Sequence, residues 1–140
     1  MDRLGELIDT QVATFTDLGS QALVEIAKND HVTFKKRIAD VMTGRKRGLS
    51  AHRLPDHHAC RLGQWYDSMQ HSEIATDPAF RALPEPHQRV HEAGKEALRR
   101  FQHGDHVATR TEVEHLEASS QQVIGCLDRL GASLAARMAA

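Results

Sequence analysis

Apolar residues recur at helical spacing in the first part of the 140-residue chain, over residues 2–43. Spacings of 4, 3, 4 and 3 connect Ala27, His31, Phe34, Ile38 and Val41. These spacings put all five positions on one face of a helix. Gly44 and the cations that follow it are typical of a helix C-terminus. We therefore expect one long helix over residues 2–43.

The last part of the chain, residues 105–137, has the most regular pattern. Spacings of three and four connect Val113, Leu116, Ser120, Val123, Leu127, Leu130 and Leu134. Such a heptad seam is typical of helices that pack in a bundle or against a partner helix. A second long helix is therefore expected over residues 105–137.

The middle of the chain is interrupted, because all four prolines lie between residues 55 and 86. We expect a loop over residues 44–57 and a short helix over residues 58–70. Asp77 followed by Pro78 predicts a helix start, and a helix from Pro84 to about Gln102 should follow. No segment alternates at period two for long enough to predict a strand. The sequence thus predicts an all-α fold with four main helices.

Composition narrows the class of protein. The 18 Lys and Arg nearly balance the 19 Asp and Glu, which argues against a broadly basic surface for nucleic acid or an anionic membrane. No stretch reaches the roughly 18 apolar residues of a membrane span, and the N-terminus lacks the features of a secretory signal. Cys60 and Cys126 are too few for a disulfide framework. We expect one cytoplasmic domain over residues 1–140, with no nucleic-acid or membrane partner.

Ten histidines are the unusual feature of the composition. His87 and His91 form an HxxxH pair, and residues four apart share a helix face. Gly94, Leu98 and Phe101 continue that face at spacings of three and four, so both histidines should point inward. His31 lies on the inward face of the first helix. Burying an imidazole without a partner costs a few kcal/mol, so these histidines need partners.

A metal ion would satisfy the three histidines together. Zinc prefers four nitrogen or sulfur ligands, and Cys60, at the start of the expected short helix, is the candidate for the fourth. A helix N-terminus lowers the pKa of a thiol, and sulfur with imidazole favours zinc over magnesium or calcium. The alternative remains that His31 is a core histidine bonded to a carbonyl and that Cys60 is a small buried apolar residue.

Three motifs in order resemble the chemoreceptor zinc-binding (CZB) domain of bacteria. The motifs are His31 followed by Phe34, then the segment from Cys60 to Tyr66, then His87 to His91. The intervals also fit, with 28 residues between His31 and Cys60 and 26 between Cys60 and His87. Many members carry Trp where this chain has Phe34. The resemblance covers roughly residues 20–131, which leaves residues 1–19 as an N-terminal helical extension.

The resemblance implies a four-helix bundle with an additional short helix that carries the cysteine ligand. It also implies one zinc per chain, held by His31, Cys60, His87 and His91. Such domains are similar to sensory modules of chemotaxis receptors or diguanylate cyclases, in which zinc or oxidation of the cysteine changes the output of a partner. A homodimer is a further implication. The output partner itself is not identified by the sequence.

A site with one thiolate and three imidazoles is coordinatively full, so it favours a sensory role over an enzyme. Cys60 is the ligand expected to leave, because it belongs to a short helix beside a loop. One alternative is a zinc hydrolase with an open site of His31, His87 and His91, although no HExxH motif is present. A hemerythrin-like di-iron protein is another, but it needs bridging carboxylates, and Glu112 with His115 is the only hint of them.

The remaining histidines should be mostly loop or solvent-face residues. These are His52, His57, His58, His71, His103, His106 and His115. His57 or His58 could stand near Cys60, and Asp30 or Asp56 could accept a hydrogen bond from a ligand imidazole.

Overall fold

The computed structural model describes residues 3–139, with side chains from residue 17 onward. Three long helices dominate it: α1 (Arg3–Met42), α4 (Pro84–Gln102) and α5 (His106–Ala139). Between them lie the short helices α2 (Arg61–Ser68) and α3 (Pro78–Ala82) and the 3-10 turns η1 (Ala51–Arg53) and η2 (Glu73–Thr76). The described residues form no strand, and the expected all-α class is confirmed.

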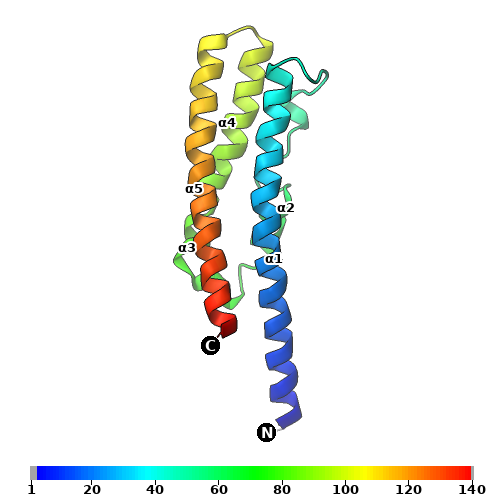
Figure 1. Cartoon of the computed structure of the whole chain (residues 1–140), viewed down its shortest axis with the longest axis vertical. Coiled ribbons are helices and arrows are strands. Elements are labelled where there is room, and N and C mark those ends of the chain that lie inside the picture. Colours follow the sequence, from blue (N-terminus) through cyan, green and yellow to red (C-terminus); the bar gives the residue numbers. More distant parts are fainter. Residues whose placement is uncertain (1–2, 140) are drawn as a thin grey trace.

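The helices pack as an up-and-down bundle (Figure 1). From the end of α1 the chain returns along the bundle through η1, α2 and η2, and α4 and α5 then form an antiparallel hairpin. The expected helical bundle is therefore confirmed. Its second member is the broken segment of residues 51–76 and not a continuous helix, as Pro55 within the segment and Pro78 after it suggest.

The helix ends follow the capping residues of the sequence. Gly44 has a φ of 75°, and the amides of Arg45 and Lys46 donate to the carbonyl of Asp40, so α1 ends as expected. The side chain of Asp77 accepts a hydrogen bond from the amide of Ala79, and Pro78 is the first residue of α3. Both predictions are confirmed.

The short helix α2 starts three residues later than the expected residue 58. Residues 56–60 form a tight turn instead, in which the carbonyl of Asp56 accepts the amides of Ala59 and Cys60. The Asp56 carboxylate accepts the amides of His58 and Ala59. Because these amides are bonded to Asp56, the turn replaces the first turn of the expected helix.

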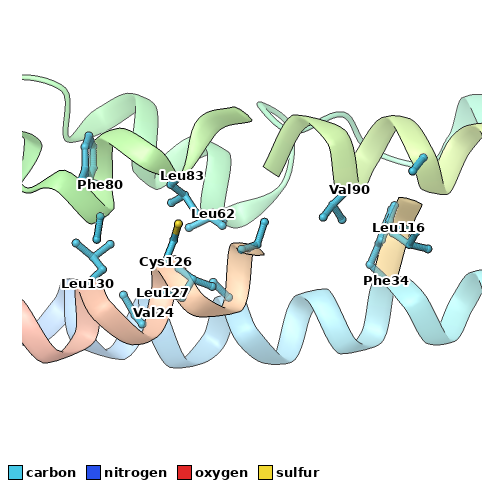
Figure 2. Close-up of a cluster of buried hydrophobic side chains, with 14 of the residues drawn as sticks. Val24, Phe34, Leu62, Phe80, Leu83, Val90, Leu116, Cys126, Leu127 and Leu130 are labelled. Atoms are coloured by element: carbon cyan, nitrogen blue, oxygen red, sulfur yellow. The ribbon is translucent and has the colours of Figure 1, made fainter. Parts of the chain in front are cut away.

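The core is aliphatic and runs along the seam of α5. Of the seven seam positions, Val113 is half-buried and the other six are buried: Leu116, Ser120, Val123, Leu127, Leu130 and Leu134. In Figure 2 the labelled side chains lie in two groups, one around Leu83 and Leu127 and the other around Val90 and Phe34. His31 and His87 lie in sequence between members of these two groups, so the bundle is apolar on both sides of the histidines.

The N-terminal part of α1 extends past the end of α5 (Figure 1). The side chains of Leu4, Ile8 and Phe15, which belong to the expected N-terminal extension, lie outside the described residues. Among the described helices, none is both long and apolar enough to cross a membrane.

Candidate metal centre

His31 lies on the buried face of α1, and only 4 % of it is exposed. Its Nδ1 atom is 2.8 Å from the carbonyl oxygen of Ala27. A carbonyl only accepts hydrogen bonds, so Nδ1 carries the proton and Nε2 keeps its lone pair. That buried Nε2 atom has no hydrogen-bond partner among the described residues. Its lone pair is therefore available to a ligand.

His87 and His91 are buried one turn apart on α4. Nδ1 of His91 donates to the carbonyl oxygen of Pro55 at 2.7 Å, so Nε2 of His91 also keeps its lone pair. The Nε2 atoms of His87 and His91 are 3.2 Å apart. Since Pro55 lies shortly before α2, the bond from His91 ties α4 to the segment that leads to Cys60.

Cys60 is the N-cap residue of α2, and its sulfur accepts a hydrogen bond from the amide of Gly63. The sulfur lies 3.2 Å from Nε2 of His87. The next residue, Arg61, forms an ion pair with Asp30 at 3.1 Å. Asp30 precedes His31, so the first residue of α2 is paired with α1 directly beside the histidine.

Gly63 lets the turn of residues 56–60 lie against α2. A Cβ atom at Gly63 would be 1.7 Å from the carbonyl oxygen of His57 and 2.9 Å from the Cα atom of His58. These are backbone atoms, which cannot move aside by rotating a side chain. The close approach that places Cys60 beside His87 therefore requires glycine at this position.

The candidate ligand nitrogens converge on one point. Those of His31, His87 and His91 all lie within 4.8 Å of one another. Cys60 is outside this group of mutually close atoms, but its sulfur is 3.2 Å from Nε2 of His87. Zn–N bonds of about 2.0–2.1 Å put neighbouring ligands on a tetrahedron about 3.3 Å apart. Nε2 of His87 is at hydrogen-bond distance from Nε2 of His91, whereas the buried Nε2 of His31 has no partner among the described residues, and a cation at this point would bind all three nitrogens. The residues therefore fit a zinc ion.

Burial lowers the pKa of all three histidines. The pKa of His87 falls to about 2 because of burial and then the nearby charge of His91. That of His91 falls to about 4 through burial, against the opposing bond to Pro55. Burial also lowers the pKa of His31. The neutral imidazole is the metal-binding form, so all three rings are ready to bind at neutral pH.

The pKa of the Cys60 thiol differs from the sequence-based expectation. Burial raises it, although the amides of Gly63 and Leu62 act in the opposite direction. The helix N-terminus thus has the expected effect on Cys60, but burial is the larger influence in the metal-free protein. A bound cation is therefore needed to hold the sulfur as a thiolate.

The hydrogen-bond acceptors behind the histidines are backbone carbonyls and not the expected carboxylates. Ala27 and Pro55 supply them, whereas Asp30 pairs with Arg61 and Asp56 caps the turn. A carbonyl partner of His31 was one of the alternatives open from the sequence, but the Pro55 carbonyl behind His91 was missed, because every residue has a carbonyl. The i, i−4 position of Ala27 relative to His31 was the only available signal.

The other seven histidines lie largely where expected. Six are exposed and His57 is half-buried. His58 pairs with Asp67, with 2.9 Å between Nδ1 and Oδ2. The carbonyl oxygen of His57 lies 3.8 Å from the sulfur of Cys60, so the expectation that one of this pair stands near Cys60 is confirmed for His57. The ring of His57 lies near that of His87, with 5.9 Å between their centroids.

The two alternative metal sites gain no support from the geometry. A cavity of about 240 Å³ opens beside His31, Cys60 and His91, and Asp30 is the carboxylate in its lining. Because Asp30 is bound to Arg61, it is not a free general base for hydrolysis. Glu112 and His115 pair with each other on α5, outside the cluster, so they provide no bridging carboxylate for two irons.

Comparison with known proteins shows a similarity over the region that holds the histidines and Cys60. Searches of curated proteins and of solved structures gave no match. Residues 31–98 match the sequence model of the chemoreceptor zinc-binding domain. The matched region contains His31, Cys60, His87 and His91, so it covers every residue of the cluster. Residues 31–98, a little less than half of the chain, are therefore similar to the chemoreceptor zinc-binding domain.

Proposed function

We propose that this protein is a sensory domain that binds one zinc per chain through His31, Cys60, His87 and His91. The observation that carries the proposal is the buried Nε2 atom of His31, which has no hydrogen-bond partner among the described residues and faces two further imidazoles. A set of one sulfur and three nitrogens leaves no position for substrate water. We therefore assign no catalytic residue.

The protein's own groups prepare this site. The carbonyls of Ala27 and Pro55 fix the tautomers of His31 and His91, so that the Nε2 lone pairs face inward. Burial keeps the rings neutral. Bound zinc would supply the positive charge that holds the sulfur of Cys60 as a thiolate. The ligands come from α1, α2 and α4, so occupancy of the site is linked to the packing of three helices.

Cys60 is the switch in this proposal. Its thiolate attacks an oxygen of a peroxide: an S–O bond forms, the O–O bond breaks, and sulfur loses two electrons to give a sulfenic acid while the other oxygen leaves as water after protonation. The oxidised sulfur is a poorer metal ligand. Since the same sulfur caps α2, its departure also weakens the start of that helix.

Elemental analysis tests the metal assignment. Wild-type protein, purified under reducing conditions at neutral pH, should hold about one zinc per chain. Cys60→Ala and His87→Ala should bind zinc more weakly in competition with a chelator, and His115→Ala, an exposed histidine of α5, should behave as wild type. Absence of zinc from the wild type after supplementation would refute the proposal.

Peroxide titration tests the switch. The zinc affinity, measured by competition with a chromophoric chelator, should fall in step with modification of Cys60 measured by mass spectrometry. Cys126→Ser provides the matched control, because Cys126 is buried outside the cluster and its replacement should leave this fall in affinity unchanged. Full modification of Cys60 with α2 unchanged in hydrogen exchange would contradict the switch.

The proposed partners are a second copy of the chain and a signalling protein of the chemotaxis or cyclic-di-GMP type in the cytoplasm. Leu18 and Ile26 are 46 % and 38 % exposed on α1, and Ala22, midway between them, is also exposed. These positions share one face. Leu18→Glu with Ile26→Glu should reduce the dimer in analytical ultracentrifugation, whereas Val107→Glu at the start of α5 should not. A wild-type monomer at all concentrations would refute the dimer.

A further inference from the structure

His57 is a fourth imidazole beside the proposed zinc ligands. Ring centroids within the cluster are 4.9 Å apart for His87 and His91 and 5.2 and 6.1 Å for the pairs that include His31. The centroid of His57 is 5.9 Å from that of His87. By ring spacing, His57 is therefore about as close to His87 as the members of the cluster are to one another.

The ring nitrogens of His57 have no hydrogen-bond partner among the described side chains, and the residue is half-buried. Its ring packs against that of His58, with 4.1 Å between their centroids. Its neighbour His58 differs, because its Nδ1 atom is held by Asp67. The nitrogens of His57 do not point into the group formed by His31, His87 and His91, so a rotation of the side chain is needed to bring one there.

The backbone between His57 and Cys60 holds the two residues on one turn. The carbonyl oxygen of His57 lies 3.8 Å from the sulfur of Cys60, and Gly63 packs against the same carbonyl. Asp56 stabilises the turn through bonds to the amides of His58 and Ala59. Withdrawal of the sulfur by rotation about the Cα–Cβ bond of Cys60 therefore leaves His57 in place.

We propose that His57 is a reserve zinc ligand, which takes the fourth position when the sulfur of Cys60 is withdrawn. The reserve site is formed by four histidines: His31, His57, His87 and His91. Imidazole is a good zinc ligand, so the metal stays bound, more weakly, after the thiolate has left. This inference rests on the proposed zinc site and concerns how that site signals. The domain alternates between two zinc-bound states, and loss of zinc is not required for signalling.

The test compares zinc affinities in a background that lacks the sulfur. Cys60→Ser is suitable, because a serine hydroxyl also caps a helix and α2 keeps its start. In this background His57→Ala should lower zinc affinity by about tenfold or more, the loss typical of a removed metal-site group. His58→Ala is the matched control and should leave the affinity of Cys60→Ser unchanged. With Cys60 present, His57→Ala should bind zinc as wild type does.

Cobalt provides a second readout. The cobalt-loaded Cys60→Ser protein should lose the sulfur-to-metal charge-transfer band and keep the intense visible absorption of a tetrahedral site, which His57→Ala should then weaken. Equal zinc affinities for Cys60→Ser with and without His57 would overturn the inference while the wild-type zinc site stands. Equal losses of zinc affinity for His57→Ala and His58→Ala in the Cys60→Ser background would overturn it too. Such losses would show that both substitutions act by disturbing the turn and not by removing a ligand. Failure of wild-type protein to bind zinc would refute the proposed function itself.

Discussion

Replacing Gly63 with Ala should destabilise the protein, although alanine is the better helix former. The added Cβ would lie 1.7 Å from the carbonyl oxygen of His57, so α2 or the turn has to move. Overpacking of this kind costs about 1–3 kcal/mol, and the change from Gly to Ala in a helix stabilises by about 1 kcal/mol. The steric effect is the larger one, because the contacted atom belongs to the backbone.

The expected net loss in the free energy of unfolding is up to about 2 kcal/mol. With a urea dependence of about 2 kcal/mol per molar for a small protein, the unfolding midpoint should fall by up to about 1 M. Circular dichroism of the metal-free, reduced protein in urea measures it. Zinc affinity should fall as well, because the moved turn carries Cys60 away from His87.

Gly131→Ala on α5 is the matched control. Its Cβ would lie 3.6 Å from Cγ1 of Val24, an ordinary contact, so only the helix preference acts and the midpoint should rise. A Gly63→Ala protein whose midpoint rises like that of Gly131→Ala, with zinc affinity unchanged, would refute the reasoning about the turn.

The other predictions concern protons, zinc and the core. The pKa values of about 4 for His91 and about 2 for His87 lie below their ordinary value of 6.5, so the unfolded chain binds protons first. Metal-free protein should therefore be most stable above pH 6.5 and lose stability as pH falls toward 4 and below; urea midpoints that do not change between pH 7.5 and 5 would contradict this. Zinc at about 100 times its Kd should raise the free energy of unfolding by about 2.7 kcal/mol, and His87→Ala should abolish most of this gain. A calorimetric Tm that zinc does not raise would refute stabilisation by zinc. Leu127→Ala, at a fully buried position, should cost about 2–5 kcal/mol in urea unfolding; a loss no larger than that of Val107→Ala, which is exposed, would show that the seam is not the core.

Helix positions were predictable from the sequence wherever a periodic face met a capping residue. The 3.6-residue period located α4 and α5 almost to the residue, and Asp77 with Pro78 located α3. The start of α2 was not predictable in this way, because the Asp56 carbonyl and side chain compete with the helix for the amides of residues 58–60. Such competition depends on one side chain and leaves no periodic signal.

The candidate ligands followed from inward-facing polar residues, but their surroundings did not. His31, His87 and His91 interrupt apolar helix faces, and the sequence pattern makes them candidates for that reason. The carbonyl of Pro55 has no sequence signature, and neither does the burial that raises the pKa of Cys60. The position of His57 beside His87 depends on a close backbone approach at Gly63, which a single glycine does not reveal.

The short turn around Gly104 between α4 and α5 has a consequence for the order of folding. Contacts between these two helices are local in sequence, so the hairpin can form early and without metal. His31 and Cys60 lie outside that hairpin and reach His87 only after α1 and the returning segment have docked. Zinc would then bind late in folding and connect α1 and the returning segment to a hairpin that is already formed. Removal of the metal should loosen α1 and α2 first, and amide hydrogen exchange should be fastest in these two helices while α4 and α5 stay protected.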